Sequence, residues 1–266
     1  MITPSLKPIK YKDHRTYDFH RTFGTIEQIP EEFNFDQTGA MPDQNAEGLP
    51  QGCTAFTVTD MASNNDKRNY TDKRYTYEKT KMMMGVKGEV PVDQMTSMKS
   101  ATIYGVKAKE RPEEEALNNR QGPYFIVKRL NDSYFDGLVS AMWKKQGTLS
   151  VGTVWLGVFD YVKPNGVIPG FTPPQNFEVG HNWEACGVKV VEGERRIICK
   201  SWQGKNWGDG GYCYFSRKQI DDLLSIKGSG AFGQKSIEPG DIVRVKMTII
   251  EQIISYIKQI IIKLFP

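Results

Sequence analysis

The cysteine at position 53 stands where a thiol could act as a nucleophile. It follows a turn that contains Gly48, Pro50 and Gly52, and it opens the partly apolar run CTAFTVTDMASN. This pattern places the sulfur at or near the N-terminus of a helix, where unpaired N–H groups and the positive end of the helix dipole favour the thiolate. The thiolate is the reactive form, so Cys53 is a candidate nucleophile. The same pattern is also compatible with a buried, inert cysteine.

His181 is the only histidine beyond residue 20, and it begins a strand-like run directly after Gly180. A thiol nucleophile needs a base that takes its proton, and an imidazole serves this purpose. Because the body of the chain offers one imidazole, we expect Cys53 and His181 to act together. The alternative for a lone histidine is a purely structural role.

A third unusual segment is SWQGKNWGDGGY (201–212), in which two tryptophans alternate with four glycines. An aromatic strand follows it. Taken alone, this segment is also compatible with a glycine-rich hairpin held by aromatic packing.

The elements that must position these residues follow from the hydrophobic pattern. Helical periodicity and capping residues predict helices over 53–64, 73–84, 91–104 and 131–146. The period then becomes strand-like, and strands are predicted over 148–159, 181–191, 195–202, 211–217 and 241–246. Helices first and strands second indicate an α+β fold with two lobes in one cooperative unit.

The two ends of the chain have a different character from its body. Residues 1–32 are polar, basic and interrupted by prolines, which indicates an extended arm. Residues 247–266 form a strongly amphipathic helical pattern, for which docking on the domain or self-association is expected. Its polar face carries few cations, so a membrane role is not expected.

Composition excludes several classes of function. The formal net charge of +4 in 266 residues is too small to indicate a nucleic-acid partner. Four cysteines and three histidines argue against a disulfide scaffold and against a histidine-rich metal site, and no cofactor or metal is expected. No secretory signal is visible and no stretch reaches about 18 consecutive apolar residues, so we expect the cytoplasm or another reducing compartment.

Three segments together resemble papain-like cysteine peptidases of the C1 type. GCTAF (52–56), GHNWEACGV (180–188) and KSWQGKNWGDGGY (200–212) are similar to the three motif blocks of that family and occur in the same order. The resemblance implies a papain-like two-lobed domain over 33–246, with an N-terminal helical lobe and a C-terminal lobe of antiparallel β-sheet or barrel. It also implies hydrolysis of peptide or protein substrates through a thioester.

The resemblance assigns roles to individual residues. Cys53 takes the role of the nucleophile, and His181 that of the general base that later acts as a general acid. Gln44 takes the role of the side-chain donor in the oxyanion hole; because it stands farther upstream of the cysteine than is usual, Gln51 is the second candidate. Trp202 matches the tryptophan that shields the histidine from water.

The family's orienting asparagine is missing, because Lys200 stands immediately before Ser201 and Trp202. A lysine has no acceptor for the N–H of the histidine ring. Either a nearby carbonyl or another side chain orients His181, with Asn182, Ser201 and Asn206 as candidates, or catalysis is impaired. The alternative function is therefore a catalytically impaired papain-like domain used for binding or assembly.

Two further positions depart from the family pattern. Gln203 stands between Trp202 and the next glycine, which indicates a one-residue insertion. Pro50 stands where secreted members carry a disulfide-bonded cysteine, and this agrees with a reducing compartment.

Overall fold

The computed structural model describes residues 17–18, 28–175 and 180–236, with side chains over 28–175 and 180–234. The chain divides into two units, Met1–Lys235 and Ser236–Pro266, and the fold described below is that of the first. The predicted strand 241–246, the predicted helix 247–266 and most of the arm 1–32 lie outside the described residues. They remain predictions.

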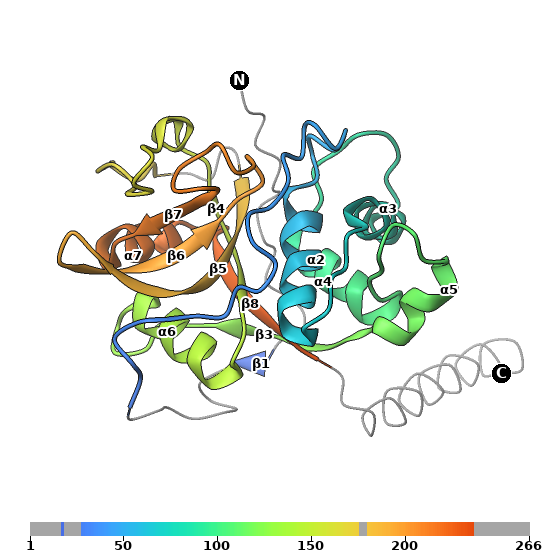
Figure 1. The fold of residues 1–266 in the computed structure, drawn as a ribbon, viewed down its shortest axis with the longest axis horizontal. Helices are drawn as coiled ribbons and strands as arrows, with labels where there is room; N and C mark the ends of the chain where they lie inside the picture. The colour runs from blue at the N-terminus through green and yellow to red at the C-terminus, as the bar shows by residue number, and fades with distance from the viewer. Residues whose placement is uncertain (1–16, 19–27, 176–179, 237–266) are drawn as a thin grey trace, which may run out of the picture. The chain divides into compact units, whose positions relative to one another are not determined.

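The first half of the described chain is mainly helical, as the sequence predicts. Its helices are α2 (Cys53–Asp66), α3 (Lys73–Met84), α4 (Gln94–Ile103) and the short α5 (Glu113–Ala116), followed by a 3-10 turn, η1 (Leu117–Asn119). These elements gather on one side of the unit (Figure 1). The predicted helices over 53–64, 73–84 and 91–104 are confirmed with end shifts of a few residues. None of the described helices is both long and apolar enough to cross a membrane.

One sheet forms the other side of the unit. Its strands are β1 (Tyr17–Asp18), β2 (Phe33–Asn34), β3 (Gln121–Val127), β4 (Leu149–Val154), β5 (Gly180–Val191), β6 (Glu194–Lys200), β7 (Tyr212–Phe215) and β8 (Gly230–Ser236). They pair in the order β1-β3-β8-β4-β5-β6-β7, and β2 pairs with β5. β1 runs parallel to β3, whereas β4, β5, β6 and β7 pair with their neighbours in antiparallel orientation. The α+β prediction is therefore confirmed.

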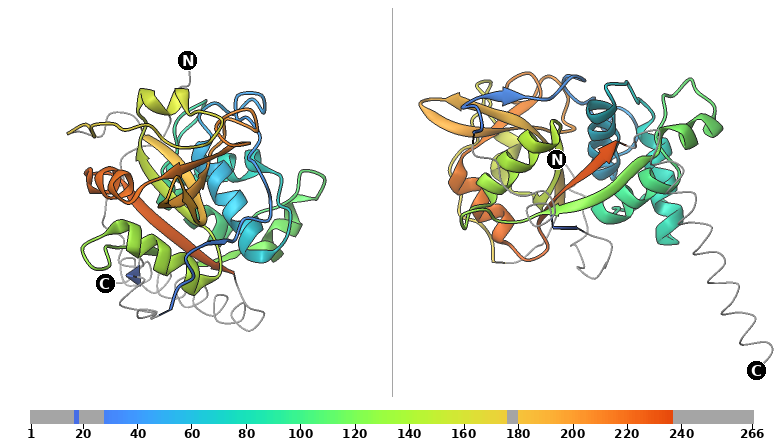
Figure 2. Two further views of the ribbon diagram at one scale, coloured as in Figure 1. Left: turned by 60° about the vertical axis from the view of Figure 1, so that its left-hand side comes forward. Right: turned by 90° about the horizontal axis from the view of Figure 1, so that it is seen from below.

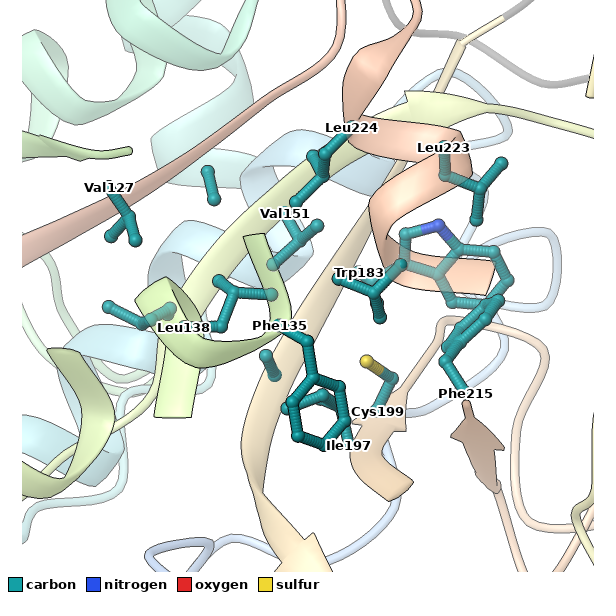
Figure 3. Packing of buried hydrophobic residues seen from close by; sticks show 14 of the residues in the cluster. Val127, Phe135, Leu138, Val151, Trp183, Ile197, Cys199, Phe215, Leu223 and Leu224 are labelled. Atoms are coloured by element: carbon teal, nitrogen blue, oxygen red, sulfur yellow. The ribbon is translucent and has the colours of Figure 1, made fainter. Parts of the chain in front are cut away.

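The core of the sheet lobe lies beneath two further helices, α6 (Tyr134–Lys145) and α7 (Arg217–Ser225). Figure 3 shows Phe135 and Leu138 of α6 and Leu223 of α7 packed with Val151 and Trp183 of the strands. All five side chains are buried, so this apolar cluster fixes the strands on which His181 and its neighbours stand.

Helix α2 is the helix of the helical lobe that faces the sheet, and it packs against β5 as well as against α3 (Figure 2). Its first turns contain threonines and a valine, which disfavour a helix intrinsically, but every residue from Cys53 to Asn64 is buried, so tertiary packing outweighs propensity. Two hydrogen bonds join α2 to β5: Thr57 Oγ1 donates to the Asn182 carbonyl at 3.2 Å, and Asn64 Nδ2 donates to Glu184 Oε1 at 2.7 Å.

Two predictions for the N-terminal arm and for the strand over 148–159 need correction. β1 lies inside the arm and pairs with β3, so this part of the arm belongs to the sheet. β4 ends at Val154, and the chain turns into a 3-10 helix, η2 (Gly157–Tyr161), that buries Phe159. The aromatic pattern that resembles a strand there is explained by the packing of Phe159 against Trp155 and Trp183.

Candidate active site

Cys53 is the first residue of α2, and a tightly folded turn delivers it. The Leu49 N–H donates to the Gln44 carbonyl and the Gly52 N–H donates to the Leu49 carbonyl, both at 2.8 Å. A Cβ on Gly52 would lie 2.9 Å from the Leu49 carbonyl oxygen, so the turn requires glycine at this position. No side chain caps the helix at Gly52. The N–H groups of the first turn and the positive helix end are therefore arranged to stabilise a thiolate or an oxyanion beside Cys53.

His181 stands at the start of β5, where it pairs with Thr153 of β4. Its side chain is fully buried. Three indoles surround the ring, with centroid distances of 4.5 Å to Trp183, 4.7 Å to Trp155 and 5.0 Å to Trp202. Burial lowers the pKa of His181 well below the ordinary histidine value, which keeps the imidazole neutral in this arrangement.

Both ring nitrogens of His181 are engaged in hydrogen bonds. The indole Nε1 of Trp202 donates to Nδ1 at 2.7 Å, and Nε2 lies 2.8 Å from the Ser201 hydroxyl. An indole nitrogen can only donate, so Nδ1 carries the lone pair and the proton of the neutral ring is on Nε2, which donates to Ser201 Oγ.

Of the three side chains proposed to orient His181, Ser201 is the one that contacts the ring. The amide oxygen of Asn182 instead accepts hydrogen bonds from Ser150 at 3.0 Å and Gln94 at 3.3 Å. Asn206 is exposed. Ser201 therefore lies where a group that orients His181 is needed, although the resemblance places the family's orienting asparagine one residue earlier, at Lys200.

Trp202 links Cys53 to His181. It is buried in the same apolar cluster as Cys53, and it bonds to His181 through its indole nitrogen. Its backbone carbonyl accepts from the N–H of Gln44 at 3.0 Å, which ties the turn before Cys53 to the segment after β6. Turn, helix and strand thus bring Cys53, His181, Ser201 and Trp202 into one site.

Gln44 is fully buried at this site, and its Nε2 donates to the Pro50 carbonyl at 2.6 Å. A primary amide has two N–H groups, so one remains for a further acceptor. Gln51 lies half-buried in the turn, two residues before Cys53.

Lys200 points away from His181 into a buried ionic cluster, which we call the Lys200 cluster. Its ammonium lies 2.7 Å from Asp36 Oδ1, 3.0 Å from Asp60 Oδ2 and 3.4 Å from Glu184 Oε2. It also donates to Thr38 Oγ1 at 2.5 Å and to the Gly39 carbonyl at 3.0 Å. β6 ends at Lys200, and Ser201 is the first residue beyond the strand, so the two neighbouring side chains enter different sites.

The charges of the Lys200 cluster are unequal. Lys73 pairs with Asp60 at 2.6 Å, so two ammonium groups face the carboxylates of Asp36, Asp60 and Glu184. Burial raises the pKa of Glu184 to about 7. The attraction of Lys200 lowers this pKa but does not offset the cost of burying the charge, and the negative charges of Asp60 and Asp36 raise it further. Burial would lower the pKa of Lys200, but Glu184 and Asp60 hold it well above its ordinary value.

The other three cysteines differ from Cys53 in their surroundings. Cys186, Cys199 and Cys213 are buried thiols in or beside the strands, and burial raises the pKa of each. They are therefore expected to be inert. Among residues 28–175 and 180–234, no group of three His, Cys, Asp or Glu side chains is arranged to hold a metal ion.

Several residues of the site were not singled out from the sequence. Trp155 and Trp183 contact His181, and Asp36, Asp60 and Glu184 surround Lys200. One signal was available: a lysine inside a buried strand segment requires carboxylates nearby. Which carboxylates these are depends on tertiary structure.

The sequence matches no protein-family model, and it matches no curated protein sequence significantly. Its fold, in contrast, is similar to several solved structures. Xylellain, a cysteine protease from Xylella fastidiosa, superposes with a TM-score of 0.67 at 15% identity, covering 89% of this chain and 97% of that one. A procathepsin L 3 from the larval midgut of Tenebrio molitor gives a TM-score of 0.61 at 13% identity, covering 79% of this chain and 71% of that one. The bromelain protease from Ananas comosus, solved with the inhibitor E64, gives 0.58 at 16% identity, covering 79% and 100% of the two chains. The chain therefore has the papain-like cysteine-protease fold.

Proposed function

We propose that the protein is a cysteine-type peptidase that hydrolyses amide bonds of peptide or protein substrates, with Cys53 as nucleophile and His181 as general base and acid. The observation that carries this proposal is the position of Cys53 at the uncapped N-terminus of α2, in the same buried cluster as Trp202, which bonds to His181. The fold shared with solved cysteine proteases supports it.

The first half-reaction forms a thioester. His181 takes the proton of the Cys53 thiol, the thiolate attacks the scissile carbonyl carbon, and the carbonyl oxygen becomes an oxyanion. The N–H groups at the start of α2 and the second N–H of Gln44 are the donors available to this oxyanion. Collapse of the tetrahedral intermediate breaks the C–N bond, and the leaving amine receives the proton from His181.

The second half-reaction releases the acid product. His181 takes a proton from a water molecule, and the resulting hydroxide attacks the thioester carbon. The C–S bond then breaks, and the proton returns to the Cys53 sulfur. Ser201 holds the other ring nitrogen throughout, so no third charged residue is needed.

The test is turnover of a fluorogenic peptide library, measured alongside labelling with an epoxide probe at neutral pH. We expect hydrolysis that Cys53→Ala abolishes and Cys186→Ala leaves within about twofold. The probe should label Cys53 and leave Cys186, Cys199 and Cys213 unlabelled in the folded protein. Hydrolysis that survives Cys53→Ala, or labelling of Cys53 no faster than of an ordinary thiol, would contradict the proposal and favour a binding or assembly role.

A further inference from the structure

The contact between Trp202 and His181 constrains the proton that catalysis must move. The indole N–H points at Nδ1 from 2.7 Å, and Trp202 is buried, so the contact is shielded from water. Since the proton of the neutral ring is on Nε2, facing Ser201 at 2.8 Å, Nδ1 carries the only ring lone pair that can accept the proton of Cys53. In this arrangement the indole occupies that lone pair.

A protonated ring is incompatible with the same contact. An imidazolium donates from both nitrogens, so protonation would bring an N–H at Nδ1 against the N–H of Trp202. A hydrogen bond made only to the neutral form of a group disfavours its charged form. The indoles of Trp155 and Trp183 and the Ser201 hydroxyl, which also contact the ring, are all neutral and add no charge that would favour the imidazolium.

We propose that Trp202 is a positioning residue that holds His181 as the neutral tautomer protonated on Nε2, and that it must release Nδ1 before Cys53 can transfer its proton. This inference rests on the proposed function, since it concerns the same pair of residues. It differs from the shielding role that the resemblance implies, because a shield supports the active ion pair whereas this contact opposes its formation.

The two roles predict opposite effects of one substitution. Trp202→Phe keeps an aromatic ring in the cluster but removes the N–H donor. If the indole opposes the imidazolium, the pKa of His181 rises in the variant and more Cys53 is thiolate near neutral pH. The hydrogen bond corresponds to about a tenfold change in this equilibrium. If Trp202 only shields the pair, the variant loses reactivity.

Trp207→Phe is the matched control. Trp207 is also a buried tryptophan whose indole N–H makes a hydrogen bond, but it donates to the Phe159 carbonyl at 2.8 Å, whereas the bond to Nδ1 of His181 belongs to Trp202. Its replacement should therefore change the rate of alkylation of Cys53 by no more than about twofold.

The experiment measures the second-order rate of alkylation of Cys53 by iodoacetamide between pH 5 and 8, together with the imidazole ¹⁵N shifts of His181. For the wild type, the spectrum should show an unprotonated Nδ1 and a protonated Nε2. Trp202→Phe should raise the rate of Cys53 alkylation near pH 6 about tenfold or more. A protonated Nδ1 in the wild type, or an unchanged or lower rate in a folded Trp202→Phe variant, would overturn the inference.

The wild-type spectrum requires no variant, so it decides the tautomer even if Trp202→Phe fails to fold. Neither measurement requires peptide turnover. Loss of the proposed peptidase activity would thus be seen separately, as an absence of hydrolysis with the predicted tautomer still present.

Discussion

The hydroxyl of Ser201 lies 2.8 Å from Nε2 of His181. The family's motif has an asparagine at the position that Lys200 takes in the sequence, yet the ring contact comes from the following residue. The strand ends at Lys200, whose side chain enters the Lys200 cluster, while Ser201 turns to the histidine. The hydroxyl oxygen can accept a hydrogen bond from the Nε2–H group and so fix the orientation of the ring, without the charge that a lysine would bring.

Ser201→Ala should therefore reduce the rate of peptide hydrolysis. Loss of one buried hydrogen bond to a reacting group of this kind lowers kcat about 10–100-fold. Ser201→Thr retains the hydroxyl and serves as the control, with a smaller loss. Steady-state kinetics on a fluorogenic peptide measure both, and a Ser201→Ala variant with wild-type kcat would show that the contact does not orient the ring.

Lys200→Met should strongly destabilise the fold. Removing the ammonium leaves Asp36, Asp60 and Glu184 buried with Lys73 as the remaining cation, and breaking a buried ion pair in this way destabilises by about 3–5 kcal/mol. The control is Lys218→Met, which removes an exposed pair with Asp222 and should change stability by less than about 1 kcal/mol. Urea unfolding measures both free energies, and equal effects would contradict the ionic account.

Glu184 should make stability depend on pH near neutrality. Its pKa is raised to about 7 in the folded chain, against roughly 4.3 when unfolded, so the folded state binds more protons between these values. This contribution to stability is present at low pH and is lost as pH rises toward 7 and above. Glu184→Gln removes it, so the stability of the variant relative to wild type should increase by on the order of 1–3 kcal/mol between pH 5 and 8.

The measurement is urea unfolding of wild type and Glu184→Gln at several pH values. The buried His181 contributes in the opposite direction, because its lowered pKa removes stability as pH falls, but it is present in both proteins and cancels in the difference. Glu78→Gln, at an exposed position on α3, is the control for the loss of one surface carboxylate. A flat difference for Glu184→Gln would mean that Glu184 remains ionised throughout.

Gly52→Ala should displace Cys53. The added Cβ would lie 2.9 Å from the Leu49 carbonyl oxygen and 3.1 Å from the Leu49 Cβ, so the turn before α2 must shift. We expect kcat/KM to fall about tenfold or more, because small displacements of a reacting group have large effects. Gly157→Ala is the control, since a Cβ there meets nothing within 4 Å. If both variants have wild-type kcat/KM, the turn does not set the position of the thiol.

Much of the architecture follows from local sequence patterns. Helices α3 and α4 begin after the capping residues Asp72 and Asp93, whereas α2, which carries Cys53, has no side-chain cap and is held by burial. The strands around His181 are rich in β-branched and aromatic residues. β3 and β8 were not predicted. β3 contains Gly122 and Pro123, and β8 (GAFGQKS) begins with glycine; both read as turns until their partners in the sheet are known. Helix α7 was not predicted either, although the sequence carries its signals: a capping box at Ser216 and the apolar residues Ile220, Leu223 and Leu224 at helical spacing.

The residues of the candidate site also fall into those that the sequence identifies and those that only the tertiary structure reveals. The motif blocks identify Cys53, His181 and Trp202, because those residues occur in a recognisable local context. The donors, acceptors and charges that surround them come from distant segments: Asp36 meets Lys200 across 164 positions of the chain, and Asn64 meets Glu184 across 120. Such partners are set by tertiary packing. The reducing compartment and the roles of residues 1–16 and 247–266 stay predictions.

The most direct test of the central claim is to trap the covalent intermediate on Cys53. The protein is mixed with an activated peptide ester, quenched with acid within milliseconds to seconds, and analysed by intact mass followed by peptide mapping. We predict a mass increase equal to the acyl group, located on the peptide that contains Cys53 and absent from Cys53→Ala and His181→Ala. Ester turnover without any adduct on Cys53, or with undiminished rate in Cys53→Ala, would contradict the account.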